Sequence, residues 1–158
     1  MSIFRGFKFF RLILVILVSL VSLTISPLKG YCDDWVFVDN NKDYTTYYNS
    51  SSIRIYKQQK IIKVWGKDVY TKKGKDDLLK YNIDGIDKRK YSDFNHALTL
   101  FLFDYKEWKM SLKTVTYYSN SGDVLFDKNY VTKWNNMKPD SESDLFLKKI
   151  LKDNNIQR

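Results

Sequence analysis

A predicted β-hairpin constrains the fold of this chain more than any other part of its sequence. Between residues 108 and 118, side chains alternate as in a strand with one buried and one solvated face, and Val115 breaks the pattern. Residues 119–122 are turn formers, and Gly122 can adopt the positive φ that a short hairpin with a bulge requires. Residues 124–126 begin the return strand. A hairpin alone is marginally stable in water, so the rest of the chain must add strands and a cover. The residues expected on one face are Trp108, Met110, Leu112, Thr114, Thr116 and Tyr118.

Further segments of the chain carry strand signals. Residues 61–70 are apolar on both faces, so we expect them to form a central strand. A buried strand at 97–103 should join the hairpin in an antiparallel meander. The length of 158 residues is that of a single domain. Aromatic residues make up 16% of the chain, which favours a sheet with a substantial core. The other expected strands cover residues 35–38, 45–48 and 53–56.

The end of the chain carries clear signals for a helix. Ser141 is the expected N-cap. Asp144 follows three residues later, where its negative charge interacts favourably with the positive end of the helix dipole. Apolar residues recur at i, i+4 spacing as far as Leu151, so one stripe of the helix should pack on the sheet. The predicted fold class is therefore α+β, with a C-terminal helix on an antiparallel sheet.

The first 32 residues have the pattern of a Sec signal peptide. Basic residues precede an apolar run of 14 residues, 12–25, which is shorter than the roughly 20 residues that span a bilayer. Cleavage after Cys32 would leave a mature domain of residues 33–158; an uncleaved anchor and a lipidated Cys32 are weaker alternatives. We therefore expect export to the periplasm, cell surface or outer membrane, with membrane contact through this segment alone.

Charge and composition limit the chemistry of the exported domain. Removing residues 1–32 takes away four basic and no acidic residues, so the net charge falls from +9 to +5 and the domain has no cysteine. This mild basic balance favours a protein or an acidic polysaccharide as partner and argues against nucleic acid. His96 is the sole histidine and has no cysteine or second histidine with which to bind zinc. With no nucleophile motif, we expect a non-enzymatic binding protein without a cofactor, and pairing of two copies is left open.

Two groups of residues are candidate binding surfaces. The connection 71–95 is highly charged, and we expect a long variable segment with a helical turn at 76–81. Basic residues at both ends of this connection, called the basic segment below, could bind an acidic partner, although a solvated loop explains them as well. The basic segment consists of Lys72, Lys73, Lys75, Lys88, Arg89 and Lys90. An aromatic stripe is the second candidate, but most of its members should be core or cross-strand pairs: Tyr44, Tyr47, Tyr48, Trp65, Tyr117, Tyr118 and Tyr130.

The order of these pieces resembles the surface-adhesin protein E family of Gram-negative bacteria. The resemblance covers nearly all of residues 35–152 and rests on several short signatures in the same order. These signatures are Trp35, Tyr47-Tyr48, Ser51-Ser52-Ile53, Val64-Trp65, Asp104 at a strand end, Thr116-Tyr117-Tyr118, Ser121-Gly122-Asp123-Val124-Leu125, Trp134 and Pro139-Asp140-Ser141. It implies an antiparallel sheet of about six strands with a C-terminal helix across it.

The resemblance also implies a role. The family's best-known member is an outer-membrane adhesin that binds host extracellular-matrix and serum proteins, so we expect a similar adhesin here. The alternative is a periplasmic or envelope-resident domain that binds a small ligand or another envelope protein. Many members have a cysteine after the aspartate that ends the strand before the hairpin. Here Tyr105 follows Asp104, so no disulfide tie is expected.

Overall fold

The structure is a computed structural model that describes residues 34–80 and 90–157. The predicted signal peptide lies outside the described residues. Asp33–Arg158 forms one compact unit, and no helix in its described part is long and apolar enough to cross a membrane. The elements are β1 (Trp35–Asn40), β2 (Tyr44–Asn49), η1 (Ser50–Ser52), β3 (Arg54–Tyr56), β4 (Ile61–Tyr70), α2 (Lys72–Lys80), η2 (Lys90–Asp93), β5 (Phe94–Asp104), β6 (Lys109–Ser119), β7 (Val124–Asn129), β8 (Asn135–Asn136) and α3 (Glu142–Asp153).

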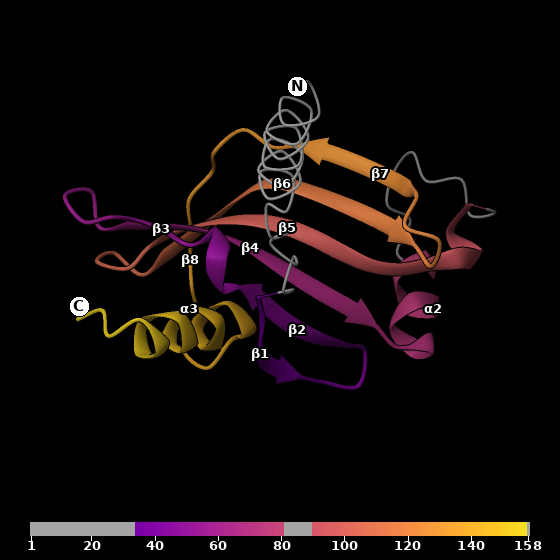
Figure 1. Cartoon of the computed structure of the whole chain (residues 1–158), viewed down its shortest axis with the longest axis horizontal. Coiled ribbons are helices and arrows are strands. Elements are labelled where there is room, and N and C mark those ends of the chain that lie inside the picture. The colour runs from indigo at the N-terminus through magenta and orange to yellow at the C-terminus, as the bar shows by residue number, and fades with distance from the viewer. Residues whose placement is uncertain (1–33, 81–89, 158) are drawn as a thin grey trace, which may run out of the picture. The chain divides into compact units, whose positions relative to one another are not determined.

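The described strands form one antiparallel sheet in the order β1-β2-β4-β5-β6-β7, with β3 paired to β4 and β8 paired to β6. Figure 1 shows this sheet with α3 lying beside β1 and β2. The predicted α+β class, the central position of 61–70 and the meander are confirmed. Short turns join β1 to β2, β5 to β6 and β6 to β7, whereas the connection from β4 to β5 contains α2 and η2.

The β6–β7 hairpin forms as predicted, but its alternation does not run unbroken. Gly122 has a φ of 89°, as the turn requires. Phe101 pairs with Leu112, whereas the preceding residue of β5 pairs with Thr114, so one extra residue bulges from β6. Such a bulge reverses the phase of the side chains that follow. Val115 therefore shares a face with Leu112, and the prediction that Thr114, Thr116 and Tyr118 share that face is wrong.

The core lies between the sheet and α3. The helix buries Phe146, Leu147 and Ile150, which are 3%, 0% and 0% exposed. They pack with residues of the two central strands, such as Ile62 and Phe103, which are both 0% exposed. Each such side chain contributes about 1.5–3 kcal/mol of transfer free energy. The predicted packing of the helix stripe on the sheet is confirmed.

The start of α3 is held by its third residue rather than by the N-cap side chain. Ser141 occupies the N-cap position as predicted, but its hydroxyl donates to the carbonyl oxygen of Lys138 (2.7 Å) and does not cap the helix. Asp144 is 1% exposed, and its carboxylate accepts hydrogen bonds from Trp108 Nε1 and from the backbone N–H of Asp140, both at 2.7 Å. The residue predicted to interact with the helix dipole is thus also a buried link between α3 and the hairpin that joins β5 to β6.

The described part of the connection after β4 contains a longer helix than predicted. The helix α2 begins at Lys72, four residues before the expected helical turn, and β5 begins at Phe94. Thr71 precedes α2, and its hydroxyl accepts a hydrogen bond from the backbone N–H of Gly74 (3.1 Å). Gly74 lies so close to the β1–β2 turn that a Cβ would be 2.0 Å from the carbonyl oxygen of Asp43. Gly74 lowers the helix propensity of α2, but its lack of a side chain allows the helix to pack against the β1–β2 turn.

Candidate binding sites

A pocket lies between the first turn of α3 and the sheet. Its volume is about 320 Å³, near the lower end of the roughly 300–1,000 Å³ of small-molecule sites. Strands β2, β4, β5 and β6 line one side, and α3 with its N-cap lines the other. The lining residues are Tyr44, Thr46, Asp68, Phe101, Phe103, Met110, Ser141, Glu142, Ser143 and Phe146.

One end of the pocket is apolar and aromatic. The ring of Phe146 lies 5.2 Å from that of Phe101 and 5.6 Å from that of Phe103, measured between centroids. Gly66 of β4 makes room for these rings, since a Cβ there would come within 2.6 Å of Phe101. Such an end has the shape and polarity that suit the apolar part of a ligand.

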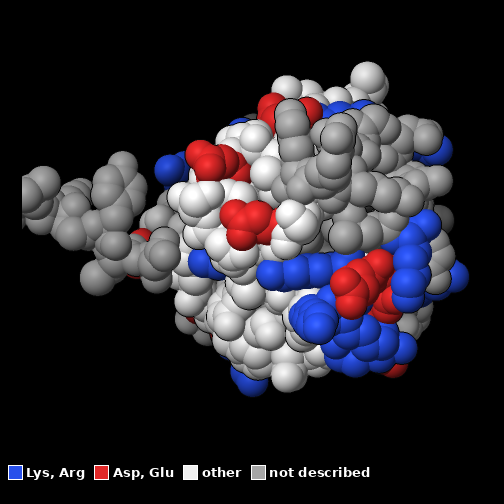
Figure 2. Space-filling view, turned by 90° about the vertical axis from the view of Figure 1, so that its right-hand side faces the viewer, with Lys and Arg blue, Asp and Glu red and all other residues white. Residues whose placement is uncertain are grey.

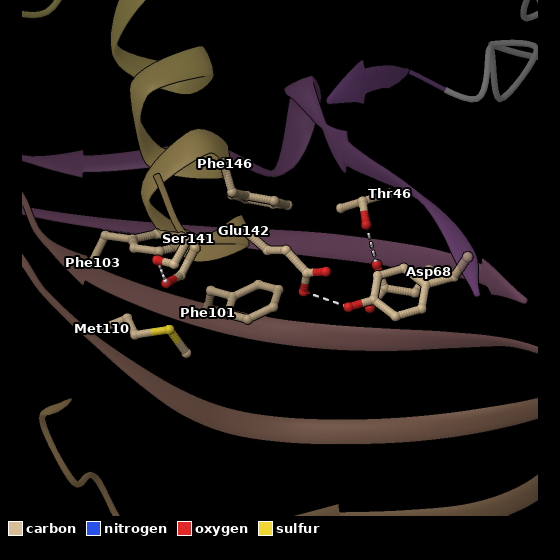
Figure 3. Close-up of a pocket in the computed structure, with 10 residues that line it drawn as sticks. Thr46, Asp68, Phe101, Phe103, Met110, Ser141, Glu142 and Phe146 are labelled. Atoms are coloured by element: carbon tan, nitrogen blue, oxygen red, sulfur yellow. Dashed lines mark hydrogen bonds between the residues drawn. The ribbon is translucent and has the colours of Figure 1, made fainter. Parts of the chain in front are cut away.

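The other end carries two carboxylates. Asp68 Oδ1 accepts a hydrogen bond from Thr46 Oγ1 at 2.7 Å. Glu142 accepts from Asn41 Nδ2 at 2.8 Å and from the hydroxyl of Tyr44. Figure 3 shows the Glu142 carboxylate pointing from the helix toward the end where Thr46 and Asp68 lie, away from Phe103.

Burial changes the acidity of these groups. Desolvation, together with the negative charge of Glu142, raises the pKa of Asp68 to about 6 although the Thr46 hydrogen bond opposes the shift. Desolvation and the hydrogen bond to Glu142 raise the pKa of Tyr44, so this tyrosine stays protonated. Among the described residues, no lysine or arginine forms an ion pair with either carboxylate.

A second candidate is the run of residues 127–136, called the exposed segment below. All ten of its residues are exposed. Val131, Trp134 and Tyr130 are 92%, 37% and 37% exposed. Clustered exposed hydrophobic side chains mark an interaction surface more often than single ones do. Lys128 adds positive charge, with its Nζ 5.2 Å from the centre of the Tyr130 ring.

The exposed segment is tied to β6 at several points. The backbone N–H of Tyr130 donates to the carbonyl oxygen of Lys113 (2.8 Å), and that of Lys133 donates to Ser111 Oγ (3.1 Å). The strand β8 then pairs with the start of β6. The exposed side chains are thus presented by a fixed backbone, which lowers the entropy that binding would cost.

The structure places three members of the basic segment on α2: Lys72, Lys73 and Lys75. Lys73 is paired with Asp43 (2.8 Å) and Asp77 (2.7 Å). Figure 2 views the side that carries α2 and shows basic side chains grouped with acidic ones. Lys88 and Arg89 lie outside the described residues. Lys90 is the first residue of η2, and only its backbone is described. The six residues together therefore stay a prediction.

The aromatic stripe is divided between core, pocket and sheet. Tyr48 is 2% exposed in the core and Tyr44 lines the pocket. Tyr117 packs against Phe94 and Phe126 with ring centroids 5.2 and 5.3 Å away. These residues follow the prediction of core and cross-strand roles, whereas Tyr130 is exposed. Tyr47 lies on β2 against Phe37, Trp65 lies half-buried on β4, and Tyr118 stacks on His96 with the ring centroids 5.0 Å apart.

Sequence reasoning missed the pocket residues Asp68 and Glu142. Gly66 and Val64, two and four residues before Asp68 on β4, face the helix, so strand alternation places Asp68 on the same face. An aspartate on that face was the signal from which the pocket could have been predicted. Within the described part of the chain, no three His, Cys, Asp or Glu side chains are grouped as metal ligands would be.

Comparison with known proteins identifies the family. The model of the surface-adhesin protein E family matches residues 35–150, which include every strand of the described sheet and most of α3. No curated protein matches the chain. Because the match covers well over half of the chain, from β1 into the C-terminal helix, this protein belongs to the surface-adhesin protein E family and is an adhesin-like binding protein.

Proposed function

We propose that the signal peptide 1–32 directs export by Sec, and that the domain 33–158 acts at the cell surface as a non-enzymatic adhesin. Its partner is an extracellular-matrix or serum protein of a host. Family membership supports an exported surface protein with protein partners.

One observation carries the choice of binding surface. Seven large hydrophobic side chains are exposed among the described residues, and four of them, Val124, Tyr130, Val131 and Trp134, belong to β7 or the exposed segment. The strand β7 pairs with β6 and has no second neighbour in the described sheet. Its free edge can accept an extended segment of a partner, while aromatic side chains beside it supply contact area. Lys128 and Lys133 favour a partner with an acidic surface.

The test is binding of the purified protein to immobilised fibronectin, laminin and serum albumin. The double variant Val131→Asp and Trp134→Ala should lose at least tenfold in affinity for whichever of these proteins the wild type binds, because central apolar contacts dominate interfaces. The matched control is Tyr56→Ala on β3, which removes another exposed aromatic side chain, 46% exposed against 37% for Trp134. Unchanged binding by the double variant would reject this surface.

The alternative is a periplasmic or envelope-resident domain, and the pocket beside α3 favours it because adhesion to a large protein does not require a cavity. A tag after Arg158, with protease added to intact cells, separates the two locations. Loss of the tag places the domain outside; an intact tag removes the adhesin role. A second copy of the chain is a competing occupant of the β7 edge, and sedimentation equilibrium of wild type and double variant would detect it.

A further inference from the structure

We infer that the pocket between α3 and the sheet binds a small organic cation, a primary ammonium group carried on an apolar or aromatic body. This inference concerns the pocket alone and holds at the cell surface or in the periplasm. Its failure would leave the adhesin proposal, which uses the exposed segment, unchanged.

The charge of the ligand follows from the carboxylates. Asp68 uses Oδ1 to accept from Thr46, and its Oδ2 has no donor among the described residues. Each oxygen of Glu142 accepts one hydrogen bond from a neutral donor, Asn41 or Tyr44. A carboxylate oxygen has more than one lone pair, so both groups retain capacity for a charged donor. An ammonium group has three N–H donors and would provide the positive charge that the described residues do not.

The body of the ligand follows from the opposite end. The rings of Phe101, Phe103 and Phe146 and the side chain of Met110 line it. Phe101 and Met110 are half-buried and form the accessible surface of this wall, while Phe103 and Phe146, at 0% and 3% exposed, fix it from behind through core packing. An apolar body covers this wall, and an aromatic one can also make ring contacts worth about 0.5–1.5 kcal/mol.

An inorganic cation fits the same pocket less well. Calcium takes six to eight oxygen ligands, whereas the described residues offer no cluster of three acidic or metal-binding side chains. A water-filled carboxylate pair could attract such an ion, but the aromatic wall would remain without a function. An organic cation uses both ends of the pocket.

The surroundings of Asp68 agree with this assignment. Burial raises the pKa of its carboxyl to about 6, and a bound ammonium group would oppose that shift. Four titratable groups interact electrostatically with the Asp68 carboxyl. They are Glu142 of α3, Tyr44 of β2, Tyr70 of β4 and Tyr117 of β6. The three tyrosines stay neutral because burial raises the pKa of each.

The test is isothermal titration calorimetry of the protein purified from the envelope of expressing cells. The probe is 2-phenylethylamine, which is a cation at pH 7.5; 2-phenylethanol and 3-phenylpropionate are the neutral and anionic probes of similar size. We expect the amine to bind at least tenfold more tightly than either, and its affinity to fall between pH 7.5 and pH 5 as Asp68 takes up a proton.

Two charge-removing variants assign the binding to the pocket. Asp68→Asn and Glu142→Gln should each weaken amine binding at least tenfold, with thermal melting to show that the variants fold. Asp76→Asn, which removes the same charge from an exposed position on α2, should bind as the wild type does. Equal affinity for the alcohol and the amine, equal binding by wild type and Asp68→Asn, or no heat from the amine at about 10 mM would each overturn the inference.

Discussion

Replacing Asp144 by asparagine should destabilise the domain, because this carboxylate links the start of α3 to the strand hairpin. Trp108 Nε1 donates to Oδ1 at 2.7 Å, and the backbone N–H of Asp140 donates to Oδ2 at 2.7 Å. Lys148 Nζ lies 2.8 Å from the same Oδ2. The side chain of Asp144 is 1% exposed, so water cannot replace a lost partner.

The magnitude follows from the number of acceptors. Asparagine offers a single carbonyl oxygen and cannot accept from both Trp108 and Asp140, so one N–H loses its acceptor at a cost of about 1–3 kcal/mol. Loss of the ion pair with Lys148, whose side chain is 52% exposed, adds at most about 1 kcal/mol. We expect the free energy of unfolding to fall by about 1–4 kcal/mol in total. For a domain of this size the melting temperature should fall by roughly 10 °C in circular dichroism.

The control is Asp140→Asn. This carboxylate is 85% exposed and lies 3.5 Å from the same lysine, and its φ of 58° is one that asparagine tolerates. It should change the free energy of unfolding by less than about 0.5 kcal/mol. Equal losses in the two variants would show that the buried hydrogen bonds contribute nothing beyond the charge.

The dependence on pH gives a second check. Burial raises the pKa of Asp144, but hydrogen bonds from Lys148, Asp140 and Trp108 outweigh burial and hold the pKa below its usual value. A lowered pKa in the folded state means that the stabilisation is present above the unfolded pKa of about 3.9 and disappears as pH falls through the folded pKa. The difference between wild type and Asp144→Asn should therefore shrink below about pH 4. A constant difference from neutral pH to pH 3 would refute the reasoning.

Two further predictions follow from α2 and its surroundings. Gly74→Ala should lower the free energy of unfolding in urea by about 1–3 kcal/mol, because the new Cβ would meet the Asp43 carbonyl oxygen at 2.0 Å. An unchanged free energy of unfolding would contradict the close packing. Replacing all six residues of the basic segment by glutamine should weaken heparin binding at low salt while the circular dichroism spectrum stays unchanged. Equal binding by wild type and variant at low and moderate salt would remove this segment as a binding surface.

Local patterns in the sequence were sufficient to predict most of the sheet and the C-terminal helix. The hairpin turn, the central strand and the helix stripe each depend on residues close together in the chain. The bulge in β6 could not be predicted in the same way, because it depends on the pairing of Phe101 with Leu112 across two strands. The start of α2 was missed for a related reason: Thr71 and Gly74 make their deciding contacts with a turn about thirty residues away.

The pocket shows why a binding site can be hidden in a sequence whose fold is readable. Asp68 and Glu142 are far apart in the chain, and only the position of α3 on the sheet brings both to one cavity. A carboxylate that is buried enough to have a raised pKa, with a single hydroxyl as its hydrogen-bond partner, opposes folding rather than helping it. Stability alone would favour an asparagine or an apolar residue at this position of β4. Departures from the rules of folding are concentrated at functional sites, so this aspartate is the strongest reason to look for a ligand in the pocket.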